Sequence, residues 1–384
     1  MNTIVKIRLT VRTHLEDPAP MKMSTWVAAS AAAATALALA GCSSGKTSES
    51  STDADGATAA TLMLPFPRGI FWSPLVVAEE QGYFADEGLD LTIEEADGSG
   101  FVTQQLISGN LDYGFSGAAS AVVAAEKDPN LRIPMCYPAS NIFIIVTPEG
   151  SDVASVADLR GKTLGITEAG GGEEPIVNAA LAEAGMKPGA DVTLLPIGGA
   201  GPQSLTALQN GTVDAYATSF ADLATFTAAG NKFTDITPSS LDVIPGDCMV
   251  TTAAALADPA KREIGVKIAR AYTKGAAFID ANPEGALDIV CKAVPEECTD
   301  MNYAKVYFDE VRRYAGNYQP GTPYGAVTAD GWETTVKVLA DSGVIEGTVD
   351  PVAIGTGEDI ADLQSEYSDI DLPAVQKDAQ QYAP

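Results

Sequence analysis

The sequence predicts an α/β protein made of two β/α units and a C-terminal third that is mostly helical. Between residues 61 and 147, short apolar stretches alternate with stretches of helical periodicity, and the alternation returns between 163 and 229. Such alternation is typical of a mostly parallel sheet with right-handed helical crossovers. After residue 252 helical periodicity dominates the chain.

The first unit has recognisable boundaries. Ser73 and Pro74 provide an N-cap and a first-turn proline for a helix, and Gly82 provides its stop. In the segment 89–93, Leu and Ile alternate with polar residues, as in a strand with one buried face. The expected strands are 61–65, 89–93, 111–115, 132–136 and 141–147, and the expected helices are 73–82, 101–108 and 118–126.

The second unit repeats the pattern, and the C-terminal third departs from it. Apolar residues from Ile264 to Ile279 fall on one helical face, and Pro283 ends that helix. The third opens with the strand 248–252, which needs a sheet, so we expect it to pack on the first unit. The other expected strands are 163–167, 191–196 and 213–219, and the other expected helices are 174–184, 202–209, 221–229, 284–292, 302–314 and 330–342.

The N-terminal segment has the layout of an export signal. Residues 26–41 are almost entirely apolar, but they are too few to span a hydrocarbon core of about 30 Å comfortably. Lys22 gives a short positive region before the apolar run. Leu39-Ala40-Gly41-Cys42 resembles the lipobox of bacterial lipoproteins, in which the cysteine is acylated and becomes the new N-terminus. The alternative is an ordinary cleaved signal with a chance cysteine.

The residues on either side of this signal also carry information. Glu16 and Asp17 fit poorly in a signal peptide, which favours a translation start at Met21 or Met23. After the lipobox, residues 42–60 are rich in Ser, Thr, Gly, Asp and Ala and lack apolar periodicity. We expect a flexible tether between a lipid anchor at Cys42 and a folded body.

Composition excludes several classes of function. Removal of residues 1–41 leaves 343 residues with 19 basic and 49 acidic side chains, a net charge of −30. So acidic a surface repels nucleic acid. The single histidine, His14, lies in the removed part, so Ser-His and Cys-His nucleophile pairs and His-ligated metal sites are excluded. We therefore expect no enzyme, no cofactor and no metal site.

Four cysteines follow the lipobox, namely Cys136, Cys248, Cys291 and Cys298. An even number in an exported chain favours disulfides, and four cysteines allow three connectivities. The alternative is a set of buried free thiols.

Three sequence stretches together point to a known family. AEEQGYFADEGLDL (78–91), GNLDYGFSG (109–117) and DLRGKTLGIT (158–167) resemble the substrate-binding proteins of bacterial ABC importers, in the NMT1-like or sulfonate/nitrate/taurine group. The resemblance covers about residues 60–345. It implies a type II periplasmic-binding-protein fold, with two β/α lobes joined by two hinge strands and a ligand in the cleft between them. The stretches themselves read as turns and helix ends that identify the fold rather than the ligand.

The resemblance also implies domain boundaries, partners and one disulfide. It places lobe 1 at 61–146 plus 248–345, lobe 2 at 147–247, and a C-terminal extension at 346–384. A monomeric, extracytoplasmic, lipid-anchored protein would hand its small-molecule ligand to an ABC permease and its ATPase. The strands that enter and leave lobe 2 should be neighbours, which pairs Cys136 with Cys248. Cys291 and Cys298 flank a short loop and should pair locally.

Candidate ligand contacts lie in the loops at the carboxyl ends of the expected strands, where open α/β sheets bind ligands. Glycines and hydroxyls at helix starts present N–H groups that suit an anion, and aromatic side chains could wall an organic group. The candidates are Phe66, Arg68, Phe71, Trp72, Ser99, Ser116, Ser120, Asn141, Gly171, Gly172, Glu173 and Ser219. For each aromatic residue the alternative is a place in the core.

The charges in these loops leave two ligand classes open. Arg68 is their only basic residue and favours a small organic anion, a sulfonate or carboxylate that could be aromatic. Glu173 and Glu174 lie at the start of a helix, where their negative charges could simply interact favourably with the helix dipole. If they face the cleft, they favour a neutral or amine-bearing heterocycle such as a thiamine-precursor pyrimidine. Two further alternatives are an enzyme on this fold and a scaffolding lipoprotein without a ligand.

Overall fold

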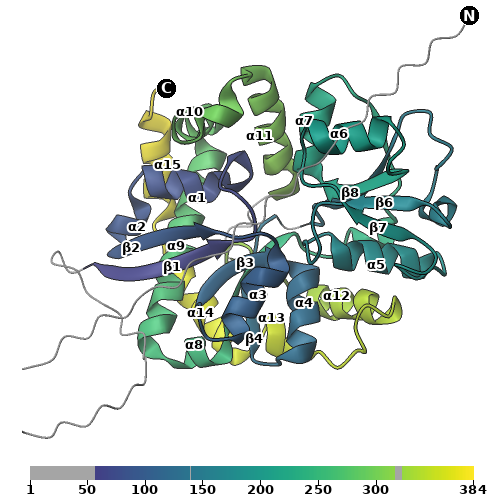
Figure 1. Ribbon diagram of the computed structural model, residues 1–384. Helices are drawn as coiled ribbons and strands as arrows, with labels where there is room; N and C mark the ends of the chain where they lie inside the picture. The colour runs from purple at the N-terminus through teal and green to yellow at the C-terminus, as the bar shows by residue number, and fades with distance from the viewer. Residues whose placement is uncertain (1–56, 139, 316–321) are drawn as a thin grey trace, which may run out of the picture. The chain divides into compact units, whose positions relative to one another are not determined.

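The computed structural model describes residues 57–138, 140–315 and 322–384, and it contains two separate five-stranded sheets (Figure 1). We call the parts built on them lobe 1 and lobe 2. The predicted signal, the predicted lipobox with Cys42 and most of the predicted tether lie outside the described residues. None of the helices in the described ranges combines the length and the apolar character that a membrane crossing requires.

The first sheet has the strand order β2-β1-β3-β10-β4. Strand β1 pairs in parallel with β2 and β3, whereas β10 runs antiparallel to β3 and β4. The strands are β1 (Thr58–Leu64), β2 (Leu89–Glu95), β3 (Tyr113–Gly117), β4 (Leu131–Cys136) and β10 (Asp247–Thr252).

The second sheet repeats this plan with the order β7-β6-β8-β5-β9. Strand β6 pairs in parallel with β7 and β8, and β5 runs antiparallel to β8 and β9. The strands are β5 (Phe143–Pro148), β6 (Thr163–Ile166), β7 (Thr193–Pro196), β8 (Ala215–Ser219) and β9 (Phe233–Asp235).

Each sheet therefore has four strands in one direction and one reversed strand, which refines the expectation of a mostly parallel sheet. The chain crosses to lobe 2 between β4 and β5 and returns between β9 and β10. The reversed strands are therefore β5 and β10, the first strand that the chain forms after each crossing. The amino end of a reversed strand lies at the edge where its parallel neighbours have their carboxyl ends.

Helices cover both faces of each sheet. Alternate residues of β1 face opposite ways: Leu62 and Leu64 belong to the core that contains α1 and α9, and Met63 belongs to the core that contains α3 and α4. In lobe 2, α6 and α7 lie on one face and α5 on the other (Figure 1). These helices are α1 (Ser73–Glu80), α3 (Ser99–Ile107), α4 (Ala118–Lys127), α5 (Glu174–Glu183), α6 (Pro202–Gln209), α7 (Phe220–Ala228) and α9 (Pro259–Ala281).

Helix α1 differs from the expectation in its N-cap, which is Trp72. Ser73 is its first residue rather than its cap, and its hydroxyl donates back to the carbonyl oxygen of Ile70. The expected stop is confirmed, because Gly82 adopts a positive φ of 75° directly after the C-cap. The short helix α2 (Tyr83–Asp86) that follows was not expected.

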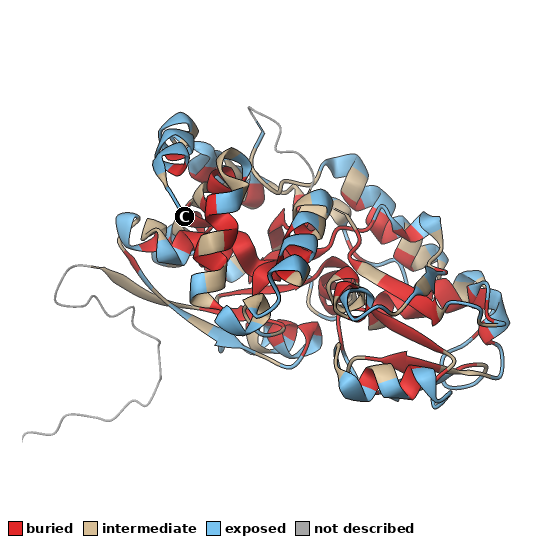
Figure 2. Ribbon diagram, turned by 90° about the horizontal axis from the view of Figure 1, so that it is seen from above, coloured by how far each residue is buried: buried red, intermediate tan, exposed pale blue. Residues whose placement is uncertain are grey.

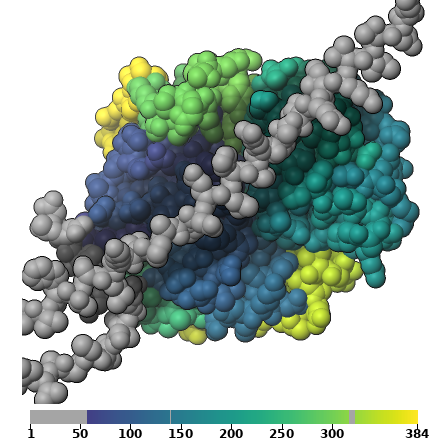
Figure 3. Space-filling model, viewed as in Figure 1, coloured from purple at the N-terminus to yellow at the C-terminus, as the bar shows by residue number. Residues whose placement is uncertain are grey.

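The C-terminal third packs on lobe 1 and reaches lobe 2. Helices α14 and α15 contact α9, while α12 contacts both α4 and α5. Figure 3 shows yellow-green C-terminal residues at the surface beside teal residues of lobe 2. The remaining helices are α8 (Ala253–Ala257), α10 (Pro283–Ala293), α11 (Met301–Ala315), α12 (Ala329–Asp341), α13 (Pro351–Gly355), α14 (Glu358–Ser368) and α15 (Leu372–Gln381).

Buried residues concentrate in the strands and in the helix faces turned toward them (Figure 2). Two disulfides add covalent links, and both predicted pairs are confirmed. Cys136 in β4 is bonded to Cys248, its direct partner in β10, and Cys291 is bonded to Cys298 across a sequence separation of 7.

Candidate functional site

A cavity of about 520 Å³ lies between the loops of lobe 1 and lobe 2. The first sheet contributes the loop after β1, the start of α3 and the amino end of β10. The second sheet contributes the amino end of β5, the loop between β6 and α5, and the start of α7. A molecule in this cavity would touch both lobes.

Half of the predicted ligand-binding residues line this cavity. They are Phe66, Phe71, Ser99, Gly172, Glu173 and Ser219. Two of them form hydrogen bonds with the local backbone. The Ser99 hydroxyl accepts a hydrogen bond from the Gly117 N–H at 3.0 Å, and the Ser219 hydroxyl caps α7 by accepting from the Asp222 N–H at 3.2 Å.

Arg68 lies outside the cavity. Its guanidinium pairs with Glu79 on α1, and its backbone N–H donates to Glu95 at 2.7 Å. Both partners of the ion pair are partly exposed, so Arg68 holds the β1 loop against its own lobe. The prediction of an anionic ligand relied on Arg68 as the cation that would pair with it, and Arg68 does not line the cavity.

Trp72, Ser116 and Asn141 do not line the cavity. Trp72 is fully buried, with its ring centroid 5.1 Å from that of Phe66, and Ser116 is fully buried in β3. The Asn141 side chain forms two hydrogen bonds with the backbone of Phe143, at 3.0 and 3.1 Å, and Phe143 lines the cavity. Asn141 therefore positions a cavity residue.

Ser120 and Gly171 line a different hollow, also of about 520 Å³, between α3, α4 and α5. A Cβ on Gly171 would lie 2.4 Å from the Glu173 carboxylate. A Cβ on Gly172 would lie 2.5 Å from Phe143, so no larger residue fits at that close approach.

The charged side chains that line the cavity are all acidic among the residues that the structure describes. Lobe 1 supplies Asp97, Asp247 and Glu297, and lobe 2 supplies Glu168, Glu173 and Asp222. The described residues contain no group of three or more acids, cysteines or histidines placed to hold a metal ion. The acids are spread around the wall, an arrangement that suits an organic molecule with several hydrogen-bond donors or a positive charge.

Glu173 sits at the start of α5 and is 2% exposed. The N–H and the hydroxyl of Thr167 donate to its Oε1 at 2.7 and 2.5 Å. Burial outweighs these bonds and raises the pKa of Glu173 to about 7. Burial likewise raises the pKa of its neighbour Glu168.

Asp247 is the most buried acid of the cavity, with 0% exposure. Neither of its carboxyl oxygens has a hydrogen-bond partner among the described residues. Burial raises the pKa of Asp247 to about 8. At neutral pH the carboxyl of Asp247 is therefore mostly protonated.

Glu297 and Asp222 are tied to the backbone. Glu297 accepts from the Ile70 N–H at 2.6 Å, and burial raises its pKa. Asp222 accepts from the Thr218 hydroxyl at 2.5 Å and from the Ala200 N–H at 3.0 Å.

Aromatic side chains form much of the remaining wall. Phe66 and Phe71 come from the β1 loop, Phe143 from β5, and Tyr303 and Tyr307 from α11. The Tyr303 and Thr225 hydroxyls lie 3.0 Å apart and link α11 to α7 across the cavity. The sequence reasoning missed Phe143, the two tyrosines and five of the six acids. It searched only the loops at carboxyl ends of strands, and Phe143, Asp247 and the residues of α11 lie elsewhere.

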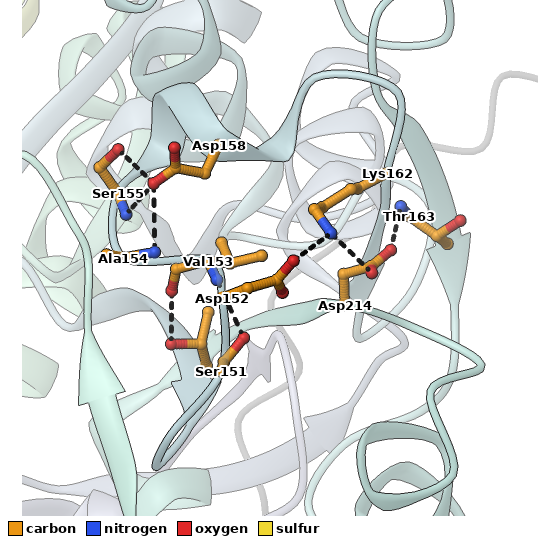
Figure 4. A network of polar contacts seen from close by, with 10 residues as sticks. Ser151, Asp152, Val153, Ala154, Ser155, Asp158, Lys162, Thr163 and Asp214 are labelled. Atoms are coloured by element: carbon orange, nitrogen blue, oxygen red, sulfur yellow. Dashed lines mark hydrogen bonds and ion pairs between the residues drawn. The ribbon is translucent and has the colours of Figure 1, made fainter.

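The DLRGKTLGIT stretch has a structural role (Figure 4). Asp158 caps the 3₁₀ turn Val156–Leu159 by accepting from the Ser155 N–H at 2.9 Å and from its hydroxyl at 2.8 Å. Asp214 accepts from the Thr163 N–H at 2.8 Å and pairs with Lys162 at 3.5 Å. This network fixes the turn into β6 and lies outside the cavity lining.

Comparisons with known proteins agree with this architecture. The riboflavin-binding protein RibY of Chloroflexus aurantiacus is 24% identical over 303 residues, which cover 78% of this chain and 85% of RibY. A solved structure from Bordetella bronchiseptica RB50 matches with a TM-score of 0.62 and 24% identity, over 81% of this chain and 98% of that one. The periplasmic aliphatic sulphonate binding protein SsuA of Escherichia coli matches with a TM-score of 0.57 and 16% identity, over 78% and 92%.

These similarities show a periplasmic-binding-protein fold with two α/β lobes, as the sequence predicted. The family model described as NMT1/THI5 like matches residues 72–286, which is more than half of the chain. The chain therefore belongs to the NMT1/THI5-like family.

Proposed function

We propose that the protein is an extracytoplasmic solute-binding protein that delivers a small molecule to an ABC importer. The family, the two-lobed fold and a cavity between the lobes support this role. Binding, rather than catalysis, is the activity we propose.

The proposed ligand is a ring-bearing molecule that carries an amine or several N–H donors. This proposal rests on the observation that all charged side chains of the described cavity lining are carboxylates. A sulfonate or carboxylate would meet like charges and no cation from Arg68, which pairs with Glu79. The aromatic side chains would stack on a flat ring. The relative RibY is named for binding riboflavin, a heterocycle, which agrees with this class.

A thermal-shift and calorimetry panel tests the ligand class. Each ring compound is offered as a matched pair, with an amine or with a carboxylate at the same position. We expect stabilisation by the amine members, about 2.7 kcal/mol at 100 times Kd. Arg68→Ala serves as the control and should leave their affinity unchanged. Tighter binding of the carboxylate members, with a loss in Arg68→Ala, would instead restore the anionic ligand.

We also propose that Cys42 carries the lipid that holds the protein at the cell membrane. The Leu39–Cys42 lipobox and the tether of residues 42–60 support the proposal. Cys42→Ala should abolish incorporation of labelled palmitate and release the protein or leave an uncleaved precursor. Normal labelling and processing of that variant would refute the anchor.

A further inference from the structure

We propose that Asp247 selects the ligand by receiving an amine, amidine or guanidine group at the buried end of the cavity. This inference rests on the proposed function and adds to it the residue that recognises the positive group.

The position of Asp247 is fixed by its backbone and leaves its carboxyl free for a ligand. Asp247 opens the reversed strand β10, where it pairs with Gly117 of β3. Its carbonyl oxygen accepts from the Tyr137 N–H at 2.6 Å. The next residue, Cys248, is bonded to Cys136. The main chain at this point is therefore held by a sheet and by a disulfide, and Asp247 is one of the residues that line the cavity.

The carboxyl of Asp247 has no structural task among the described residues. Both oxygens are buried without a partner, although leaving a buried polar group without a hydrogen bond has a free-energy cost. Glu173, Asp222 and Glu297 differ, because each accepts at least one hydrogen bond from its own surroundings. An unpaired group of this cost is expected where a ligand supplies the missing partner.

A flat positive group suits the cavity, because Phe71, Phe143 and Tyr307 line it together with Asp247. Tyr272 is completely buried nearby, and the charge of Asp247 adds to the burial that raises the pKa of Tyr272. The hydroxyl of Tyr272 and the Nε1 of Trp72 are also buried without partners among the described residues. Planar amidinium and guanidinium groups donate two parallel N–H bonds to one carboxylate and stack on aromatic faces.

Isothermal titration of the full chain with benzamidine, benzamide and benzoate tests the inference. We expect the parent to bind benzamidine best. Asp247→Asn should lower benzamidine affinity about 10-fold or more, because a charge-assisted pair is lost, and should change benzamide affinity less than about threefold. Asp86→Asn removes an exposed charge from lobe 1 outside the cavity and should bind benzamidine like the parent.

A second variant and melting curves distinguish a loss of binding from a loss of folding. Asp247→Leu keeps the branched shape of the side chain and leaves no polar group unpaired, so it should melt at or above the parent temperature while losing benzamidine binding. If both folded variants bind benzamidine like the parent, Asp247 is not the recognition residue, although the proposed ligand class stands. If the parent prefers benzoate, or ignores benzamidine at 10 mM, the ligand class and the role of Asp247 both fail.

Discussion

At the scale of single residues, Glu173 couples the fold to pH. Its carboxyl is buried, and its pKa rises from 4.5 to about 7. Between these two values the folded protein keeps a proton that the unfolded chain releases. The contribution of Glu173 to the free energy of unfolding is therefore fully present below about pH 4.5 and is lost as the pH rises through about 7. Asp247, whose pKa rises from 3.8 to about 8, acts in the same direction.

We predict that Glu173→Gln stabilises the protein at pH 8 and flattens the fall in melting temperature between pH 5 and 8. The gain should not exceed about 3 kcal/mol, because each pKa unit corresponds to about 1.4 kcal/mol and the amide oxygen can still accept from Thr167. Urea unfolding at several pH values measures it. Glu80→Gln, on the exposed end of α1, is the control and should follow the parent. A parent protein that gains stability from pH 5 to 8, with the same slope in Glu173→Gln, would contradict the assignment.

At the scale of elements, much of the fold could be predicted from periodicity. Helix α6 has the predicted bounds, and strands with alternating residues, such as β2, were located within two residues. Strand β9 has only three residues at a sheet edge, too few for a period to be visible. Helix α14 did offer a signal, since Ile360, Leu363 and Tyr367 are buried at helical spacing.

The candidate site was predicted less completely, for a topological reason. The strand-end rule applies to parallel strands, and it found the loops with Phe66, Ser99 and Glu173. Asp247 and Phe143 lie at the amino ends of the reversed strands β10 and β5, which reach the same edge from the other direction. Tyr303 comes from a helix distant in sequence. Its arrival depends on tertiary packing, which local patterns do not encode.

The 3₁₀ element Pro295–Cys298 connects a disulfide to the cavity. Cys298 ends the element, and Glu297 just before it accepts from the Ile70 N–H at 2.6 Å. Glu297 thereby ties the β1 loop to the C-terminal third of the chain.

We predict that Cys291→Ser/Cys298→Ser lowers stability by about 2.5 kcal/mol, the chain-entropy value for a loop of about eight residues. The Cys136–Cys248 disulfide closes a much longer loop, with a sequence separation of 112, so Cys136→Ser/Cys248→Ser should cost more, about 4.7 kcal/mol in the same treatment. Urea unfolding of both variants, with the parent under reducing conditions as a reference, measures the order. A larger loss from the short loop would show that native contacts of Glu297, rather than chain entropy, dominate.

At the scale of the whole described body, the two lobes touch directly around the cavity. The Gly100 N–H of lobe 1 donates to the Gly170 carbonyl oxygen of lobe 2 at 3.2 Å. Tyr303 and Thr225 form a second link, between hydroxyls 3.0 Å apart. Such contacts exist only while the lobes are together, so they bias an open–closed equilibrium in the direction that a bound ligand also favours.

We predict that Tyr303→Phe and Thr225→Val each weaken ligand binding about 2- to 10-fold, because each removes a hydrogen bond of about 0.5–1.5 kcal/mol from the closed state. Both residues also line the cavity, so a loss alone would not separate closure from direct contact with the ligand. The double variant separates them. If the shared hydrogen bond is the cause, the double variant binds no more weakly than either single one, whereas independent ligand contacts give losses that multiply. X-ray scattering supplies the second readout: the variants should be more extended than the parent without ligand and should contract to the same size when saturated. Multiplying losses with unchanged scattering would assign Tyr303 and Thr225 to the ligand and leave closure to the backbone contact at Gly100.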